Sequence, residues 1–272
     1  MKSPQGGLLK VALLQLCAGA NKAANVAVAV SMSQEAIVGG ARCVLLPEVF
    51  NFRGDTRPKG ILAEASESIP GPTINAFLPL AKKHRVSFLL GSILEKTTSQ
   101  HVYNTSVFID SSGTIAAKYR KINLFDACIG DKIIRESDTF KAGRRPTTAV
   151  VGEFRMGLSI CYDLRFPALY QQYARRGVEI LAIPSCFTKK TGQDHWETLL
   201  RARAIETLSY VLAPNQIGID ARGMQAYGHS MIVAPWGEVI ARGSHDAQEI
   251  IFGEVNIEEV RKARRVLPGI IV

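Results

Sequence analysis

The sequence predicts an α/β fold with mixed sheets, and three features of the 272-residue chain support this prediction. Short, continuously apolar runs rich in β-branched residues are typical of strands in a sheet that is covered on both faces. Longer segments with helical periodicity alternate with these runs in both halves of the chain. Hairpin patterns interrupt the alternation, which favours mixed sheets over the uninterrupted repeat of a barrel. Because no linker or change in composition divides the chain, we predict a single domain over residues 1–272.

Turn residues mark the helices of the N-terminal half. Gly39 and Gly40 end a helix over residues 21–38, because glycine readily takes the left-handed conformation after a helix C-terminus. The turn formers of residues 70–72 precede a second helix over residues 73–84. The strands expected in this half are residues 11–16, 43–47, 86–94, 102–110 and 114–119.

The C-terminal half begins after an irregular stretch. Residues 124–146 are rich in polar and turn residues, so we expect them to run over the surface. Hairpins are expected to turn at residues 152–153 and 235–237. The expected strands are residues 147–151, 155–160, 178–183, 210–216, 230–234, 238–242 and 250–255. The expected helices are residues 167–176, 195–208 and 257–266.

Composition narrows the functional class. Hydrophobic residues make up 47% of the chain and charged residues 21%, which is ordinary for a globular enzyme. No apolar run approaches the roughly 20 residues of a membrane span, and the N-terminus does not resemble a signal peptide. We therefore expect a cytoplasmic protein with no membrane partner.

Charge and cysteine content argue against nucleic-acid-binding, disulfide-rich and zinc-binding proteins. The formal charge of +9 comes mainly from scattered basic pairs without an aromatic stacking motif, which indicates a solvated surface or anionic small substrates, not nucleic acid. The five cysteines include no CxxC pair, and an odd number argues against a disulfide framework and against a zinc site. We expect no metal.

Cys161 is the first candidate for chemistry. It follows an apolar strand in the segment GLSICYDLRFP, residues 157–167, and a helix begins a few residues later. A nucleophile on such a turn projects from the edge of the sheet, where backbone N–H groups can bind an oxyanion. The alternative is a buried structural cysteine, since free cysteine behaves as a small apolar residue.

Glu48 and Lys121 also follow apolar strands. Strand ends are where α/β folds place ligand-handling groups, and apolar surroundings raise the pKa of a carboxyl such as Glu48 toward values useful for proton transfer. A fixed ammonium at Lys121 would stabilise a tetrahedral intermediate. The alternatives are a loop-capping glutamate and an ordinary surface lysine. Together with Cys161, however, these side chains are the parts needed to hydrolyse an amide through a thioester.

These segments resemble the signature motifs of the nitrilase superfamily of carbon–nitrogen hydrolases, from Val11 to about Val266. Within the superfamily the chain most resembles the Nit branch, which comprises ω-amidases and deaminated-glutathione amidases. The matching segments are residues 46–48 (LPE), 119–126 (YRKINLFD), 159–167 (SICYDLRFP), 191–192, 195–197, 201–206 and 228–231.

The resemblance implies an α-β-β-α sandwich whose subunits pair into larger assemblies, with no metal and no organic cofactor. We therefore expect a homodimer or larger homo-oligomer, and the C-terminal segment, about residues 257–272, is a candidate for the subunit interface.

The resemblance also implies roles for the candidate residues. Glu48 would be the general base, Lys121 the stabiliser of the intermediate and Cys161 the acylated nucleophile. The backbone N–H of Tyr162 would complete the oxyanion hole. Glu136 matches a second glutamate that many members have near the site.

Three further residues match positions that bind the substrate in ω-amidase-like members. Arg165 would bind the carboxylate of the substrate, which a guanidinium does in a bidentate manner. Phe187 and Thr191 would shape the pocket. The alternative for Arg165 is a structural ion pair with Asp163 or another acid.

We therefore predict an amidohydrolase that cleaves the terminal carboxamide of a small, carboxylate-bearing substrate, such as deaminated glutathione or an α-keto acid ω-amide. One alternative keeps the chemistry but changes the substrate, giving a nitrilase or an N-carbamoyl amino acid hydrolase. Another is a catalytically idle scaffold of the same fold. His195 and His229 raise the possibility of a Cys–His enzyme, but both lie in segments with a structural pattern.

Overall fold

The computed structural model describes residues 7–98, 101–129 and 132–268 of the chain. Its first six-stranded sheet consists of β1 (Leu8–Gln15), β2 (Cys43–Leu45), β3 (Ser87–Lys96), β4 (Val102–Ile109), β5 (Ile115–Arg120) and β14 (Glu249–Asn256). Its second consists of β8 (Thr147–Val151), β9 (Phe154–Leu158), β10 (Ile180–Ala182), β11 (Tyr210–Ala213), β12 (Met231–Val233) and β13 (Val239–Arg242).

The two sheets have matching topologies. The strand order is β14-β1-β2-β3-β4-β5 in the first sheet and β13-β12-β11-β10-β9-β8 in the second. In both sheets parallel pairs lie in the middle and antiparallel pairs lie toward the edges. The predicted mixed sheets are confirmed.

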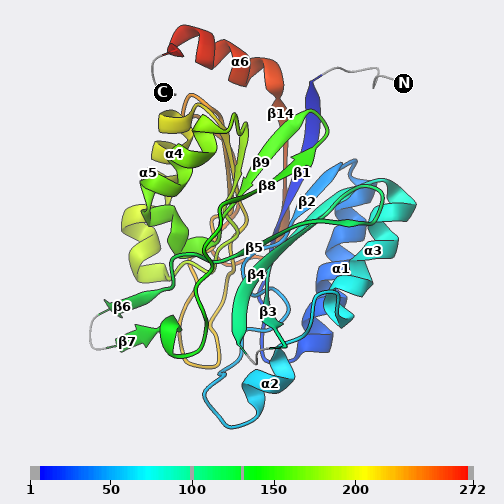
Figure 1. The fold of residues 1–272 in the computed structure, drawn as a ribbon, viewed down its shortest axis with the longest axis vertical. Helices are drawn as coiled ribbons and strands as arrows, with labels where there is room; N and C mark the ends of the chain where they lie inside the picture. The colour runs from blue at the N-terminus through cyan, green and yellow to red at the C-terminus, as the bar shows by residue number, and fades with distance from the viewer. Residues whose placement is uncertain (1–6, 99–100, 130–131, 269–272) are drawn as a thin grey trace.

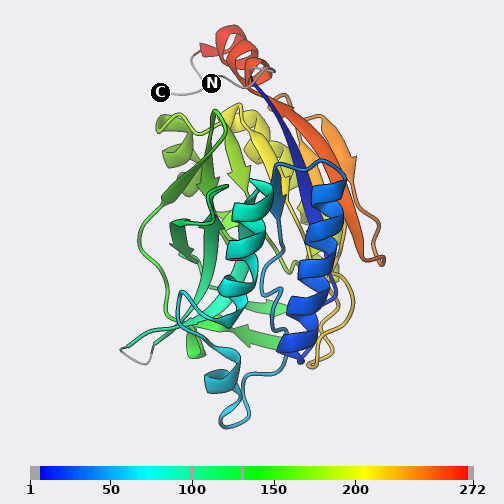
Figure 2. The same cartoon turned by 90° about the vertical axis from the view of Figure 1, so that its right-hand side faces the viewer.

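Helices cover the outer face of each sheet. Figure 1 shows the two sheets packed face to face between helices, and Figure 2 shows α1 and α3 side by side over the first sheet. The α-β-β-α arrangement implied by the resemblance is therefore confirmed. The helices are α1 (Lys22–Val38), α2 (Ile61–Ala65), α3 (Pro72–His84), α4 (Pro167–Arg175), α5 (Lys189–Thr207) and α6 (Ile257–Val266).

The continuous apolar strands follow from this layering. In β1, Val11 and Leu13 belong to the core between the two sheets, whereas Ala12 and Leu14 pack in the core beneath α1 and α3. A strand that is buried on both faces cannot alternate apolar and polar residues, because neither face meets water.

The local sequence of α1 explains its position. The Asn21 side chain caps its N-terminus by accepting a hydrogen bond from the Ala24 N–H, which satisfies a donor that the helix leaves free. Its buried face consists of small residues, Ala29, Ser33 and Ala36, which allow the helix to approach the sheet closely.

The structure corrects the expected elements in three places. Residues 124–146 are not wholly irregular, since they contain a short two-stranded ribbon of β6 (Asp126–Ile129) and β7 (Lys132–Arg135). Helix α2 was not expected, and α5 begins at Lys189 instead of residue 195. The Thr188 side chain caps α5, and the glycine at position 192, which reads as a loop residue, lies inside the helix.

The C-terminal helix α6 lies at one end of the sandwich (Figure 1), and its residues Ile257 and Val260 join the inter-sheet core. Residues 269–272 of the candidate interface segment, about 257–272, lie outside the described residues. Within the described ranges, no helix combines the length and the apolar character that a bilayer crossing requires.

Candidate active site

All eight predicted site residues line one cavity of about 560 Å³. They come from both sheets, because Glu48 and Lys121 follow β2 and β5 of the first sheet, and Cys161 follows β9 of the second. β5 runs in the same direction as β2, since β3 pairs in parallel with β2 and two antiparallel pairings separate β3 from β5. The carboxyl ends of these strands therefore meet at the same end of the sandwich.

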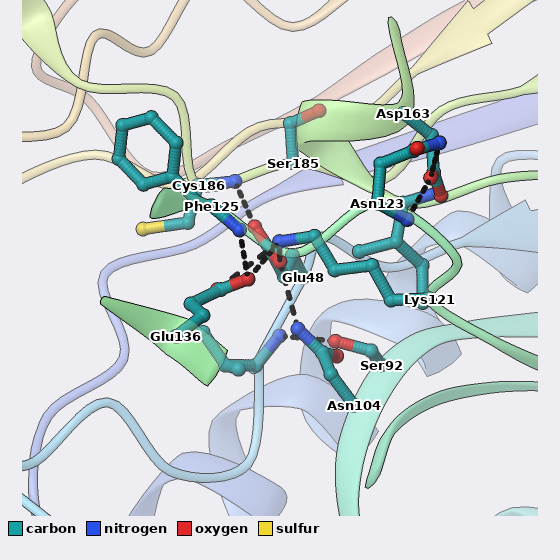
Figure 3. A network of polar contacts seen from close by, with 12 residues as sticks. Glu48, Ser92, Asn104, Lys121, Asn123, Phe125, Glu136, Asp163, Ser185 and Cys186 are labelled. Atoms are coloured by element: carbon teal, nitrogen blue, oxygen red, sulfur yellow. Dashed lines mark hydrogen bonds and ion pairs between the residues drawn. The ribbon is translucent and has the colours of Figure 1, made fainter. Parts of the chain in front are cut away.

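The Glu48 carboxylate is buried and accepts three hydrogen bonds. Its Oε1 accepts from Asn104 Nδ2 and from Lys121 Nζ, each at 2.9 Å, and its Oε2 accepts from the backbone N–H of Cys186 at 2.9 Å (Figure 3). Donors to both oxygens hold the carboxylate in one orientation. The backbone here is equally fixed, since the Glu48 carbonyl accepts from Gln216 Nε2 at 2.9 Å.

Lys121 lies between two carboxylates. Its Nζ is 2.9 Å from Glu48 Oε1 and 2.9 Å from Glu136 Oε2, and its side chain is 1% exposed (Figure 3). Burial alone would lower the pKa of the ammonium, but the charges of Glu136 and Glu48 outweigh burial and raise this pKa well above its usual value. This direction of the shift favours a Lys121 side chain that stays positively charged at neutral pH.

Glu136 belongs to a short 3₁₀ helix, Glu136–Asp138, that follows β7. Its Oε2 also accepts from the backbone N–H of Phe125 at 2.8 Å. Burial raises the pKa of the Glu136 carboxyl, the Lys121 charge opposes this effect, and the negative charge of Glu48 adds to it. Glu136 is thus the second carboxylate that pairs with the Lys121 ammonium.

Cys161 occupies the strand-to-helix turn that the sequence predicted. It follows β9 and begins a 3₁₀ helix, Cys161–Arg165, with α4 directly behind it. Its φ of +46° lies in the left-handed region, which is uncommon for a residue with a side chain and is found where surrounding contacts enforce it. Tyr162 is the next residue in this 3₁₀ helix, and N–H groups in the first turn of a helix lack intrahelical partners.

The Cys161 thiol is protonated at rest. Burial raises its pKa well above the usual value, the negative charge of Glu48 raises it further, and the Lys121 ammonium lowers it. A protonated thiol is a poor nucleophile. A nucleophilic role for Cys161 would therefore require a base within the cavity, and Glu48 is the carboxylate whose charge acts most strongly on the thiol.

Arg165 carries an uncompensated charge into the cavity. Its Nη1 is 3.2 Å from His195 Nδ1 and its guanidinium lies over the rings of Phe187 and Tyr162, while no carboxylate of the described residues pairs with it. The alternative that Arg165 pairs with Asp163 is wrong, because Asp163 accepts its hydrogen bonds from other groups.

Phe187 and Thr191 form the adjacent wall. Phe187 is buried and packs against Trp196 with ring centroids 5.0 Å apart, and Thr191 Oγ1 is 2.9 Å from Thr188 Oγ1. His195 and His229 are not among the residues that line the cavity. The Trp196 Nε1–H donates to the His229 carbonyl at 2.8 Å, which fits the structural pattern of that segment.

Two of the three donors that orient Glu48, Asn104 and the backbone N–H of Cys186, have no signal in the sequence. Asn104 lies within β4, where no motif marks it, and it reaches the site because its carbonyl pairs with the Lys121 N–H across β4 and β5. The donor at Cys186 is a backbone N–H, so the residue type at that position does not reveal it. Among the described residues, no group of three or more His, Cys, Asp or Glu side chains is arranged to hold a metal ion.

Comparison with protein families matches residues 10–265 to the family described as carbon-nitrogen hydrolase. Human omega-amidase NIT2 (Homo sapiens) is 37% identical over 262 residues, which are 95% of this chain and 92% of that protein. The deaminated glutathione amidase of Dictyostelium discoideum is 35% identical over 268 residues, which are 96% of this chain and 92% of that protein.

A third relative is longer than this chain. The nitrilase and fragile histidine triad fusion protein NitFhit of Drosophila melanogaster is 37% identical over 261 residues, which are 95% of this chain but 56% of that protein. Among solved structures, Saccharomyces cerevisiae Nit3, described as a member of branch 10 of the nitrilase superfamily, has a TM-score of 0.88 at 30% identity. The match covers 99% of this chain and 98% of that chain.

Proposed function

The chain belongs to the carbon–nitrogen hydrolase family, and from that membership we propose that it cleaves the terminal carboxamide of a small, carboxylate-bearing substrate to a carboxylate and ammonia. One observation carries the proposal: the Lys121–Glu48 ion pair lines the same cavity as the Cys161 thiol. These groups supply a base, a fixed positive charge and a nucleophile, which together are sufficient for amide hydrolysis through a thioester.

The first half-reaction forms the thioester. Glu48 takes the thiol proton as the sulfur of Cys161 attacks the amide carbonyl, and a carbon–sulfur bond forms. The Lys121 ammonium and the Tyr162 N–H stabilise the resulting oxyanion. The protonated Glu48 then gives its proton to the amide nitrogen, the carbon–nitrogen bond breaks and ammonia leaves.

The second half-reaction regenerates the enzyme. Glu48 takes a proton from water, and the water oxygen attacks the thioester carbonyl. The carbon–sulfur bond then breaks, the carboxylic acid leaves, and the proton on Glu48 returns to the sulfur. Glu48 serves both halves because donors to both of its oxygens hold it in one place while its protonation changes.

The substrate class follows from Arg165. Its guanidinium has no carboxylate partner among the described residues, and it lies over the Phe187 ring at 5.1 Å. A carboxylate on the substrate would complete this site with a charge-assisted, bidentate pair. Two relatives are named for amides of this class, an omega-amidase and a deaminated glutathione amidase, which supports substrates of the same kind here.

The decisive experiment traps the acyl-enzyme by mass spectrometry with a panel of ω-amides, a nitrile and an N-carbamoyl amino acid. We expect a thioester on the Cys161 peptide of the wild type, ammonia release from the amides, and neither product with Cys161→Ala. Cys128→Ala, which changes an exposed thiol, is the matched control and should retain full activity. Turnover of the nitrile or the carbamoyl compound alone would reject the amidase assignment. No adduct with any compound would favour an idle scaffold.

A further inference from the structure

The Asp163 carboxylate is fully buried next to the site and accepts four hydrogen bonds. Its Oδ1 accepts from the Asn123 backbone N–H at 2.9 Å and from Asn123 Nδ2 at 2.8 Å (Figure 3). Its Oδ2 accepts from the Tyr119 hydroxyl at 2.7 Å and from the Ile160 N–H at 2.9 Å. Burial raises the pKa of the Asp163 carboxyl, and the hydrogen bonds from its four donors oppose that rise.

The four donors come from the segments that carry the reactive side chains. Tyr119 and Asn123 stand two residues before and two residues after Lys121, at the end of β5 in the first sheet. Ile160 immediately precedes Cys161 in the turn that follows β9 of the second sheet. One carboxylate therefore connects the Lys121 segment directly to the Cys161 turn, although the two belong to different sheets.

The conformation of Cys161 requires such a connection. Its φ of +46° is unfavourable for a residue with a Cβ atom and persists only where neighbouring contacts fix the backbone. Two hydrogen bonds fix the backbone of this turn. The Ile160 N–H donates to Asp163 Oδ2, and the Cys161 N–H donates to the Pro184 carbonyl at 2.9 Å.

We propose that Asp163 is a positioning residue that fixes the Cys161 thiol and the Tyr162 N–H relative to the Lys121 ammonium. Asp163 touches neither the substrate nor the reacting atoms and is not among the residues lining the cavity. It acts through the turn and through the Lys121 segment. The inference rests on the proposed function, because it assigns these three groups to one reaction.

Asp163→Asn tests the proposal with little change in volume. The new amide NH₂ group must face two donors in place of an acceptor, so the connection breaks on one side. We expect kcat per titratable Cys161 thiol to fall about 100-fold, the scale of a displacement of about 1 Å among reacting groups. KM should change far less.

Glu67→Gln is the matched control. Glu67 is also a buried carboxylate, it accepts from the Thr73 N–H and pairs with Lys22, and it does not line the cavity. This variant should lose stability without losing kcat per thiol. Tyr119→Phe keeps the Asp163 carboxylate but removes one of its donors, so its loss of kcat should be smaller. In the double variant with Asp163→Asn the two losses should not add.

A second measurement needs no substrate. The Lys121 ammonium lowers the pKa of the Cys161 thiol, so loosening the connection should move the pH profile of Cys161 alkylation by iodoacetate to higher pH, as followed by mass spectrometry of the Cys161 peptide.

If the wild type hydrolysed no amide, the proposed function would fail while this profile still tested Asp163. A wild-type profile and wild-type kcat per thiol in Asp163→Asn would overturn the proposal. If that variant does not fold, Tyr119→Phe decides: a shifted profile supports the proposal and an unchanged one overturns it.

Discussion

In the proposed mechanism, the charge of Glu48 and its role as base have opposite effects at Cys161. Burial and the negative charge of Glu48 raise the pKa of the thiol, so in this mechanism the thiol stays protonated until Glu48 accepts its proton. The proposed nucleophile and base would then become reactive in a single proton transfer, which limits side reactions of a free thiolate.

Glu48→Gln separates these two effects. Burial of Cys161 remains, but removal of the negative charge should lower the thiol pKa, so that more thiolate is present at any given pH below it. We expect alkylation of Cys161 by iodoacetate to follow a pH profile displaced to lower pH, while amide hydrolysis falls by at least about 100-fold because the base is lost. A profile displaced to higher pH would contradict the assignment of Glu48 as the main charge acting on the thiol.

Arg165 allows a test of substrate choice at the same scale. Arg165→Met keeps the apolar stem but removes the charge, so it should raise KM for a carboxylate-bearing amide by about 10- to 100-fold, the value of a charge-assisted hydrogen bond. KM for an uncharged amide of similar size should not change. Arg145→Met, at an exposed position outside the cavity, serves as the control. Equal losses on both amides would show that Arg165 stabilises the pocket and does not bind the carboxylate.

At the scale of elements, β3 supports the segment that carries Glu48. Gly91 in β3 has no side chain because a Cβ atom there would lie 1.9 Å from the Leu46 carbonyl oxygen and 2.4 Å from the Pro47 carbonyl oxygen. Both contacts are with backbone atoms, so no side-chain rotation relieves them. The close approach of β3 to this segment therefore fixes where Glu48 enters the cavity.

Gly91→Ala should displace residues 46–48. We expect it to lower kcat by more than about 10-fold, because Glu48 moves away from the thiol, and to lower the thermal unfolding midpoint as well. Gly19→Ala is the matched control, since no heavy atom lies within 4 Å of a Cβ atom there. Steady-state kinetics and thermal unfolding of both variants check the prediction, and normal kinetics in Gly91→Ala would show that the segment yields without moving Glu48.

At the scale of the whole molecule, we propose that the protein forms a homodimer or a larger homo-oligomer. The candidate interface is the C-terminal segment, about residues 257–272. Among its described residues, Val266 and Leu267 at the end of α6 are 58% and 38% exposed and offer apolar surface to a partner copy. Apolar side chains exposed next to each other are common at interfaces between subunits.

Val266→Asp combined with Leu267→Asp tests this interface. The two charges would be buried in the assembly, so we expect a lower mass in sedimentation velocity while the far-ultraviolet circular dichroism stays unchanged. Val38→Asp, at the end of α1 where the side chain is 89% exposed, should leave the mass unchanged. An unchanged mass in the double variant would place the interface elsewhere.

Local patterns predicted most of the elements and three candidate site residues that the structure brings to one cavity. The strands of both sheets are recognisable because burial on two faces imposes an unbroken apolar run. The α1 helix is recognisable because Gly39 and Gly40 mark its C-terminal end. Glu48, Lys121 and Cys161 stood out because each follows such a strand, and the family resemblance assigned their roles. Helix α2 and the β6–β7 ribbon were not predicted, because these elements are too short to show a recognisable periodicity of apolar residues.

By itself, the sequence determined which segments are candidates for chemistry, because periodicity, capping and motifs are properties of neighbouring residues. Only the tertiary structure decided what those residues meet: Lys121 between Glu48 and Glu136, Asn104 on Glu48, and Asp163 across the two sheets. Each of these contacts depends on strand pairing or sheet packing between residues far apart in the chain. The hydrogen bonds that orient a buried charge are set by that packing, and no local pattern records them.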